Sequence, residues 1–525
     1  MSTPDDIRTQ LTDAYNRRDW ARTYRLAEQL LSFHPDMIEA YYAAGVAALE
    51  MRQIAPALAH LERAAKMEPT RAGFGAQFAR ALHTAKLEEQ ALAEADRVRP
   101  LADNDSSLLD MLGGIYAEAG AADKALGAYQ RAIELVPGHP GYRYNLANAL
   151  IALGHSEQAE HEIEACLTAE PRFWRAHLAL SNLRKQTQED NHVERMEGAL
   201  AEHRHEPMAN ICLNMALAKE HEDLGHYAQS FAHLVEGKTA ARQGLNYERQ
   251  QDQVVFSALE KAFPRPLGAN KKGDPSREPI FVFGMPRTGT TLVERILSSH
   301  PDVTMTGELL NFGMALRRGW GQRPSIWQDP DIAQHVAELD WSQIGSQYVQ
   351  STRPRTGQTA RFVDKFPFNF LHAGFIAQAL PNARMICLRR HPMDACLGNY
   401  RQLFAEKLPY YNYSFDLLDI GHYYIQFDRL MAHWQTVLPD RILQVQYESL
   451  VDDAESVTRR ILQFCDLPWN DACLRFQDNP SPVTTASALQ VRQPIYRSAV
   501  GHWKHFESEL KALQRLLADA GIRVD

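Results

Sequence analysis

The sequence predicts an all-α helical solenoid followed by an α/β domain built on a parallel sheet. Two observations lead to this prediction. In the first half, Pro35, Pro69, Pro137 and Pro171 are separated by 34 residues or by twice that number, a period typical of stacked helical pairs. In the second half, short apolar runs alternate with helical stretches, as the strands and helices of a parallel sheet do.

Small residues recur at matching positions within the 34-residue period. The interval that ends at Pro137 contains Gly113, Ala125 and Ala132. Small side chains let the two helices of a hairpin approach closely, and a proline ends the second helix. This pattern resembles that of the tetratricopeptide repeat.

A segment rich in proline, glycine and charge separates the two halves. We expect a tetratricopeptide-repeat helical solenoid over residues 1–250, a linker over 251–278 and the α/β domain over 279–525. The candidate strands are Ile280–Phe283, Arg384–Leu388 and Ile442–Gln446, and the helical stretches between them include Ala373–Ala379 and Phe415–Leu438. Ligands of such a sheet bind at the carboxyl ends of its strands.

Composition argues against several classes of protein. A net charge of −9 over 525 residues is unlike that of a general nucleic-acid binder. The six cysteines include no Cys-x-x-Cys pair, which argues against a disulfide framework and a zinc site. No apolar run approaches the ~20 residues that span a bilayer, and the polar start does not read as a signal peptide. We therefore expect a cytoplasmic protein with no bound metal, no membrane span and no nucleic-acid partner.

A glycine-rich loop between a strand and a helix is the most informative motif. Gly284 and Gly289 stand where a P-loop has its two glycines. Thr290 stands where a P-loop has lysine, and the cation, Arg287, lies inside the loop. Backbone N–H groups at such a helix start bind anions. Because the P-loop lysine serves the β- and γ-phosphates of a nucleoside triphosphate, a loop without it suits a smaller anion.

The run Pro286–Leu292, followed by His300-Pro301, resembles the 5′-phosphosulfate loop of the sulfotransferases that use 3′-phosphoadenosine 5′-phosphosulfate (PAPS). The resemblance implies a P-loop-like, sulfotransferase-like domain. Its implied contacts to the nucleotide from this loop are Arg287, Thr288, Gly289, Thr290 and Thr291.

A second anion site follows the second candidate strand. Arg390 matches the arginine of the family's 3′-phosphate site. The serine that the family has eight positions later is replaced by Gly398, and Asn399 comes next. The resemblance therefore lacks one hydroxyl contact, which Asn399 or a backbone N–H could replace.

The resemblance also implies the residues of the chemistry, by similarity to the tyrosylprotein sulfotransferases. Glu308, in a His-Pro…Gly-Glu run, matches the proposed general base. Lys365, in Asp-Lys-Phe-Pro, matches the lysine that stabilises the leaving oxygen or acts as a general acid. Arg287 is a second catalytic cation, and Ser487 matches a serine near the transferring group. We expect Glu294, on the helix after the loop, to take no part.

Two later motifs also match the family in the expected order. Tyr447, in a Tyr-Glu-x-Leu run, matches a tyrosine near the nucleotide. His502 and Trp503 match the C-terminal loop that closes over the nucleotide, although the animal enzymes have lysine where this chain has His502. The resemblance covers about residues 279–510.

The predicted function is transfer of a sulfuryl group from PAPS to an acceptor hydroxyl without a metal. A protein or peptide held by the repeats, a glycan and a small alcohol all remain open as acceptors. Two alternatives also remain open. One is a nucleoside-triphosphate-dependent P-loop kinase, against which the missing loop lysine argues. The other is an inactive sulfotransferase-like binding scaffold, which Gly398 keeps open.

Overall fold

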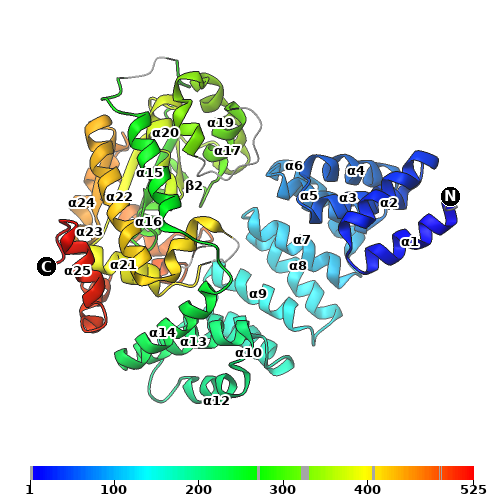
Figure 1. Ribbon diagram of the computed structural model, residues 1–525, viewed down its shortest axis with the longest axis horizontal. Coiled ribbons are helices and arrows are strands. Elements are labelled where there is room, and N and C mark those ends of the chain that lie inside the picture. The colour runs from blue at the N-terminus through cyan, green and yellow to red at the C-terminus, as the bar shows by residue number, and fades with distance from the viewer. Residues whose placement is uncertain (1–3, 269–271, 321–329, 405–407, 484, 486) are drawn as a thin grey trace. The chain divides into compact units, whose positions relative to one another are not determined.

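The computed structural model describes residues 4–268, 272–320, 330–404, 408–483, 485 and 487–525 (Figure 1). The chain forms two compact units, Met1–Phe173 and Trp174–Asp525. The predicted fold class is confirmed, because helical pairs come first and a parallel sheet follows. Residues 269–271 of the expected linker lie outside the described residues.

The first unit consists of helical hairpins in which neighbouring helices of the chain pack together. Its helices are α1 (Pro4–Asn16), α2 (Trp20–Phe33), α3 (Ile38–Glu50), α4 (Ile54–Met67), α5 (Ala72–Thr84), α6 (Glu88–Val98), α7 (Ser106–Glu118), α8 (Ala122–Leu135), α9 (Pro140–Leu153) and α10 (Ser156–Ala169). A Cβ atom on Gly113 would lie 2.5 Å from the Tyr129 ring, and one on Gly45 would lie 2.5 Å from Leu61 Cγ. The recurring small residues are therefore where the helices of a hairpin touch.

Further helices open the second unit. They are α11 (Trp174–Leu183), α12 (Val193–His203), α13 (Pro207–Asp223), α14 (Tyr227–Arg242) and α15 (Arg249–Ala262). The division at residue 173 differs from the expected boundary at 250, and part of the expected linker is helix α15. The reason is packing: Leu234, Phe256 and Phe263 are buried in one hydrophobic cluster with residues of the sheet. Helical periodicity predicts a hairpin but does not reveal which surface the hairpin covers.

A buried lysine also fastens α14 to the α/β part of the unit. Lys238 is fully buried, and its Nζ donates to the carbonyl oxygens of Gln402 at 2.7 Å and Ser414 at 2.9 Å. Burial lowers the pKa of Lys238 to about 7. The neutral amine keeps two N–H donors, so both carbonyls remain satisfied when the charge is lost.

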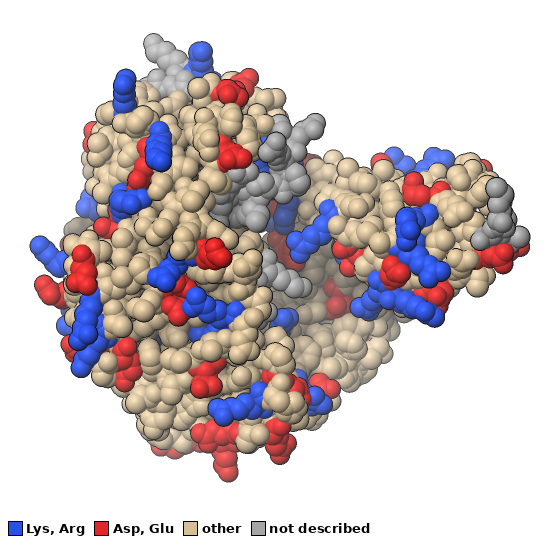
Figure 2. Space-filling model, in the orientation of Figure 1, with Lys and Arg blue, Asp and Glu red and all other residues tan. Residues whose placement is uncertain are grey.

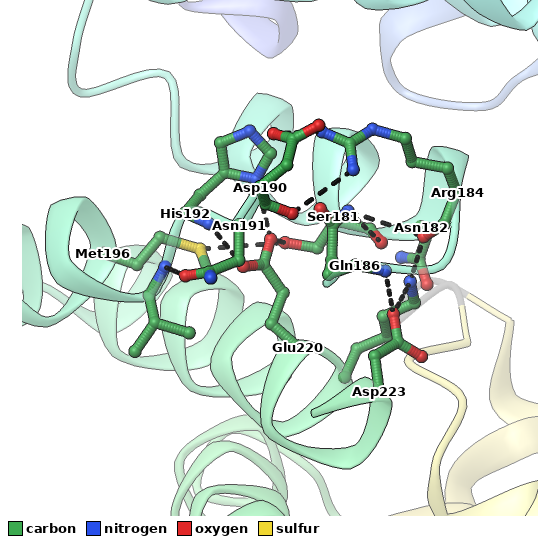
Figure 3. Close-up of polar contacts among 12 residues, drawn as sticks. Ser181, Asn182, Arg184, Gln186, Asp190, Asn191, His192, Met196, Glu220 and Asp223 are labelled. Carbon is green, nitrogen blue, oxygen red and sulfur yellow. Dashed lines mark hydrogen bonds and ion pairs between the residues drawn. The ribbon is translucent and has the colours of Figure 1, made fainter. Parts of the chain in front are cut away.

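A buried carboxylate holds the turn between α11 and α12 against α13 (Figure 3). Glu220 accepts hydrogen bonds from Ser181 Oγ at 2.8 Å and from the His192 backbone N–H at 2.6 Å, and it lies 2.9 Å from His192 Nδ1. Ser181 donates to the carboxylate and not to the imidazole, whereas a nucleophilic triad places the imidazole between the other two groups. We therefore interpret this Ser–His–Glu group as a structural contact.

The second unit is built on a parallel sheet with the strand order β2-β3-β1-β4-β5 among the described residues. The strands are β1 (Pro279–Gly284), β2 (Val303–Met305), β3 (Arg361–Lys365), β4 (Arg384–Arg389) and β5 (Ile442–Gln446). The three candidate strands of the sequence analysis are thus confirmed as β1, β4 and β5. The sequence analysis missed β2, which is three residues long, and β3, which begins and ends with a charge.

Helices cover both faces of this sheet. The helices that follow β1 are α16 (Thr290–Ser298), α17 (Asn311–Gly319), α18 (Pro330–Gln334), α19 (Trp341–Thr356), α20 (Ala373–Ala379), α21 (Pro392–Tyr400), α22 (Leu417–Val437), α23 (Tyr447–Asp452), α24 (Ala454–Phe464) and α25 (Lys511–Asp519). Along β1, Phe281 and Phe283 enter one buried cluster, whereas Ile280 and Val282 enter another. Side chains of a strand alternate between faces, so the sheet is buried on both sides.

Two further features concern the charge of the surface and the apolar character of the helices. Basic and acidic side chains intermingle on the face that Figure 2 shows. Across the described ranges, no helix has the length and apolar character that crossing a membrane requires.

Candidate active site

The loop Met285–Gly289 joins β1 to α16 at the carboxyl edge of the sheet. Its backbone has positive φ at Arg287 (65°) and at Gly289 (100°). A Cβ atom on Gly289 would also lie 2.7 Å from the ring of Tyr447, so both conformation and space require glycine there. The loop ends at the N-terminus of α16, where Thr290 and Thr291 are the first helical residues and leave backbone N–H groups for an anion.

The hydroxyl groups of this loop have different partners. Thr288 Oγ1 donates to the Met285 carbonyl at 2.7 Å, so this hydroxyl stabilises the loop. Thr291 Oγ1 lies 3.3 Å from Thr485 Oγ1. The first turn of α16 therefore contacts the C-terminal segment through the Thr291 hydroxyl.

Arg287 and Ser487 are brought together from opposite ends of the domain. Arg287 Nη1 donates to Ser487 Oγ at 2.6 Å, and Nη2 donates to Gln490 Oε1 at 2.9 Å. Burial and the nearby charges of Arg401 and Arg390 lower the pKa of Arg287 to about 10. Cations that lower one another's pKa favour a bound anion.

Arg390 completes the group that we call the anion cradle: the loop Met285–Gly289, the first turn of α16, and Arg390. Arg390 Nη1 donates to the Arg287 carbonyl at 3.0 Å, and its guanidinium lies 4.9 Å from the centroid of the Tyr447 ring. Its Nε is buried without a hydrogen-bond partner in the part of the chain that the structure describes. A bound ligand or a water molecule can satisfy a buried donor of this kind.

Gly398 and Asn399 support the loop from α21. A Cβ atom on Gly398 would lie 3.2 Å from Arg287 Cβ, so a serine there would crowd the loop. Asn399 is fully buried; its Nδ2 donates to the Pro286 carbonyl at 2.7 Å, and its Oδ1 accepts from Tyr413 at 2.9 Å. The suggestion that Asn399 replaces the missing hydroxyl at the phosphate is therefore wrong, because its amide already fixes the loop backbone.

The C-terminal loop is held over α21 by Asp394. This carboxylate accepts from the backbone N–H of Gly501 at 2.7 Å and of Trp503 at 2.9 Å. The Trp503 ring stacks on His391, with centroids 5.6 Å apart and planes at 5°. The α21 segment that follows Arg390 thus fixes the position of Trp503.

His502 makes a contact that the sequence analysis did not anticipate. Its Nε2 lies 3.0 Å from Glu222 Oε1 on α13, and the same oxygen pairs with Arg401. Arg401 and Glu222 were both missed. Glu222 lies on α13, in the segment that the sequence analysis places in the solenoid, and Arg401 follows α21 and belongs to none of the family's motifs.

Glu308 and Lys365 meet next to α16. Lys365 Nζ lies 2.6 Å from Glu308 Oε1 and 3.9 Å from Glu294 Oε2. Lys365 and Glu294 are buried, whereas 33% of the Glu308 side chain is exposed. We call these three residues the carboxylate–lysine cluster. The expectation that Glu294 takes no part is not supported by this geometry, because a buried carboxylate 3.9 Å from the ammonium affects its charge.

Burial and charge compete within this cluster. Burial by itself lowers the pKa of Lys365, but the charges of Glu308 and Glu294 outweigh burial and raise it above its ordinary value. Burial raises the pKa of Glu294 to about 7, against the opposing effect of Lys365. Lys365 therefore stays charged at neutral pH, while Glu294 changes its protonation state there.

The cluster and the cradle together allow a specific chemistry. A partly exposed carboxylate can take a proton from a hydroxyl, and a buried cation can stabilise charge on a leaving oxygen. Within the described residues, no three or more His, Cys, Asp or Glu side chains are arranged to hold a metal ion.

Comparisons with known proteins match both parts of the chain. Residues 279–471 match the model of the sulfotransferase family, and residues 116–183 match that of the tetratricopeptide repeat. An uncharacterized protein of Aquifex aeolicus is 30% identical over 77% of this chain and 54% of its own length. Protein-tyrosine sulfotransferase A of Caenorhabditis elegans is 26% identical over 43% of this chain and 60% of its own length. The chain spans about half the length of the curated relatives it matches.

Solved structures match each part separately. The sulfotransferase domain of a Synechococcus olefin synthase is 21% identical, with a TM-score of 0.34 over 46% of this chain and 91% of that domain. A thermophilic tetratricopeptide-repeat protein of Thermus thermophilus is 19% identical, with a TM-score of 0.30 over 34% of this chain and 98% of its own.

Proposed function

We propose that this chain, which joins tetratricopeptide repeats to a sulfotransferase-family domain, transfers a sulfuryl group from PAPS to an acceptor hydroxyl. The observation that carries the proposal is the pairing of Glu308 with Lys365 at 2.6 Å. This pair lies beside α16, the helix whose first turn belongs to the anion cradle. A proton acceptor, a buried cation and an anion site are the parts that sulfuryl transfer needs.

The cradle fits a nucleotide that carries several anionic groups. Three arginines act on one another there, since Arg390 and Arg401 both lower the pKa of Arg287. The buried Nε of Arg390 has no protein partner among the described residues. PAPS supplies the sulfuryl group and would be held by this loop, the start of α16, Arg390 and Tyr447.

The side chains divide the reaction between them. Glu308 takes the proton of the acceptor hydroxyl as the new bond between that oxygen and sulfur forms. The bond between sulfur and the phosphate oxygen breaks, and its electrons stay on the oxygen of 3′-phosphoadenosine 5′-phosphate. Lys365 places its positive charge beside this leaving oxygen. Arg287 and Ser487, which are hydrogen-bonded to each other, keep the loop and the C-terminal segment together around the group.

A protein or peptide is the acceptor class that we favour. Several relatives are named protein-tyrosine sulfotransferases, and arrays of tetratricopeptide repeats commonly bind extended segments. The repeats of the first unit would hold the acceptor chain. The acceptor hydroxyl would approach Glu308 at the part of its side chain that is exposed.

Gly398 does not weigh against activity. A Cβ atom at this position would lie 3.2 Å from Arg287 Cβ. Glycine therefore leaves room for Arg287 in the conformation that it has in this loop. The kinase alternative has less support, because Thr290 stands where a nucleoside-triphosphate loop needs lysine.

Two measurements test the proposal. Calorimetry should show that 3′-phosphoadenosine 5′-phosphate binds at least tenfold more tightly than ATP. Sulfur-labelled PAPS should label an acceptor from a panel of tyrosine peptides, glycans and alcohols, whereas γ-labelled ATP should not. Tighter binding of ATP, or transfer of the phosphate label, would contradict the proposal. Tight binding without any transfer would favour the inactive scaffold.

A further inference from the structure

We propose that Glu294 is a positioning residue of this site, which fixes the peptide before Glu308 and shares Lys365 with it. The inference rests on the proposed function and adds a residue that the sequence motifs do not assign. Glu294 acts through Glu308 and Lys365 and need not touch the substrate.

The position of Glu294 follows from helix geometry. It lies four residues after Thr290 on α16, and residues four apart lie on the same face of a helix. The face that begins at the anion cradle therefore continues to Glu294. Its side chain is only 2% exposed, which requires its charge or its hydrogen bonds to be satisfied by the protein.

One partner of Glu294 is the backbone of Gly307. Gly307 N–H donates to Glu294 Oε1 at 3.0 Å, and the Gly307 carbonyl accepts from the Lys365 backbone N–H at 3.1 Å. Gly307 has φ of 71°, a conformation that favours glycine. The residue before Glu308 is thus held between α16 and β3, and this fixes where the Glu308 side chain begins.

The other partner of Glu294 is Lys365. Its ammonium lies 2.6 Å from Glu308 and 3.9 Å from Glu294. When Glu294 is ionised, it competes with Glu308 for the Lys365 ammonium, and the ion pair between Lys365 and Glu308 is weaker. When Glu294 is protonated, Lys365 pairs with Glu308 alone, and Glu308 becomes a weaker proton acceptor.

The charged groups around Glu294 place this change near neutral pH. Lys365 and Asp364 come from β3, Glu308 from the loop after β2, and Arg295 from α16 itself. Burial raises the pKa of Glu294 to about 7, with Glu308 acting in the same direction and Lys365 and Arg295 against it. We therefore expect the turnover rate to rise with pH through about 7 as Glu294 ionises.

Two substitutions separate the roles of Glu294. Glu294→Gln keeps the volume and the acceptor for Gly307 but removes the charge. At pH 8 its kcat should fall about tenfold, the equivalent of one pKa unit in the cluster, and the rise through pH 7 should disappear. Glu294→Ala also releases Gly307 and should lose about 10²-fold, as misplaced catalytic groups do. The nucleotide KM should change less than about threefold in both variants, since binding uses the cradle.

Glu455→Gln is the matched control. Glu455 is an exposed glutamate on α24 that pairs with Arg459. This variant should keep the wild-type kcat and pH profile. Melting temperatures of all variants show whether the fold persists, and Glu294→Gln decides the question if Glu294→Ala does not fold.

A readout independent of turnover follows the Lys365 ammonium by ¹⁵N NMR, with its signal assigned from its loss in Lys365→Gln. The wild-type signal should shift in a step near pH 7, and Glu294→Gln should lack the step. If the wild type transfers no sulfuryl group, the proposed function fails and this titration still judges the inference. The inference would be overturned if Glu294→Gln showed the same pH dependence as the wild type in both kcat and the lysine signal.

Discussion

The anion cradle and the carboxylate–lysine cluster share helix α16 but hold their charges in different ways. In the cradle, Arg287 and Arg390 donate to hydroxyl, amide and carbonyl oxygens, so their positive charge is not neutralised by these partners. In the cluster, Lys365 faces two carboxylates. A site with uncompensated cations is suited to binding an anion. A site in which two carboxylates share one buried cation is suited to moving a proton, which is why we assign affinity to the cradle and chemistry to the cluster.

The largest effect should come from Glu308→Gln. Glutamine keeps the shape of the side chain but cannot take the proton, and loss of a general base costs about 10²–10⁴-fold in rate. Nucleotide affinity should stay within a few-fold, because the cradle is intact. Steady-state kinetics and calorimetry check both values. Near wild-type turnover would mean that the base lies elsewhere.

Lys365→Ala should reduce turnover by about 10²–10³-fold, as for loss of a preorganised group that stabilises developing charge. It should also weaken nucleotide binding modestly, because a cation has left an anionic site and two carboxylates remain. Lys511→Ala, an exposed change at the start of α25, serves as the control. An effect on affinity larger than the effect on kcat would show that Lys365 acts in nucleotide binding and not in the chemical step.

Arg287→Ala should reduce nucleotide affinity more than it reduces the turnover rate. Loss of its charge-assisted contacts should weaken nucleotide binding by about 1.5–3 kcal/mol, measured by calorimetry with 3′-phosphoadenosine 5′-phosphate. The rate at saturating nucleotide should fall much less than in Glu308→Gln. Unchanged affinity would remove Arg287 from the nucleotide site.

A separate prediction concerns stability and not turnover, and it involves the other face of β3. Asp364 accepts from the Tyr348 hydroxyl at 2.8 Å, and burial raises the pKa of Asp364 to about 8. Between about pH 4 and 8 the folded chain keeps a proton that the unfolded chain has released. This contribution to stability is therefore complete below pH 4 and is lost as the pH rises through 8.

Asp364→Asn removes this titration. The unfolding free energy of the wild type should fall relative to that of the variant by up to about 1.4 kcal/mol per pH unit in this window. Denaturant unfolding of both proteins at several pH values measures the difference. A constant difference between pH 5 and 9 would show that Asp364 does not hold a buried proton.

The sequence predicts the cradle better than the cluster because the cradle is largely local. Residues 287–291 are contiguous, so one motif reveals the loop, its cation and the helix start. The cluster joins Glu294, Glu308 and Lys365 from three segments that only the pairing of β2 with β3 brings to α16. Resemblance located two of these residues. Glu294 has no motif of its own, and its role depends on packing.

The same reasoning explains the differences in the fold. Spacing of prolines and small residues predicts helical hairpins well, since helix contacts within a hairpin are local. Whether a hairpin stacks on the next repeat or on a sheet depends on distant partners, such as the contact of Lys238 with Gln402 and Ser414. For this reason α11–α14, which the sequence analysis places in the solenoid, belong to the second compact unit.

The division between binding and chemistry can be measured directly in single-turnover reactions with sulfur-labelled PAPS. Arg287→Ala and Glu308→Gln are compared with the wild type as the nucleotide concentration is raised to saturation. The account predicts that Arg287→Ala recovers most of the wild-type transfer rate, whereas Glu308→Gln stays about 10²–10⁴-fold slower at every concentration. Recovery of Glu308→Gln at saturation, or failure of Arg287→Ala to recover, would contradict it.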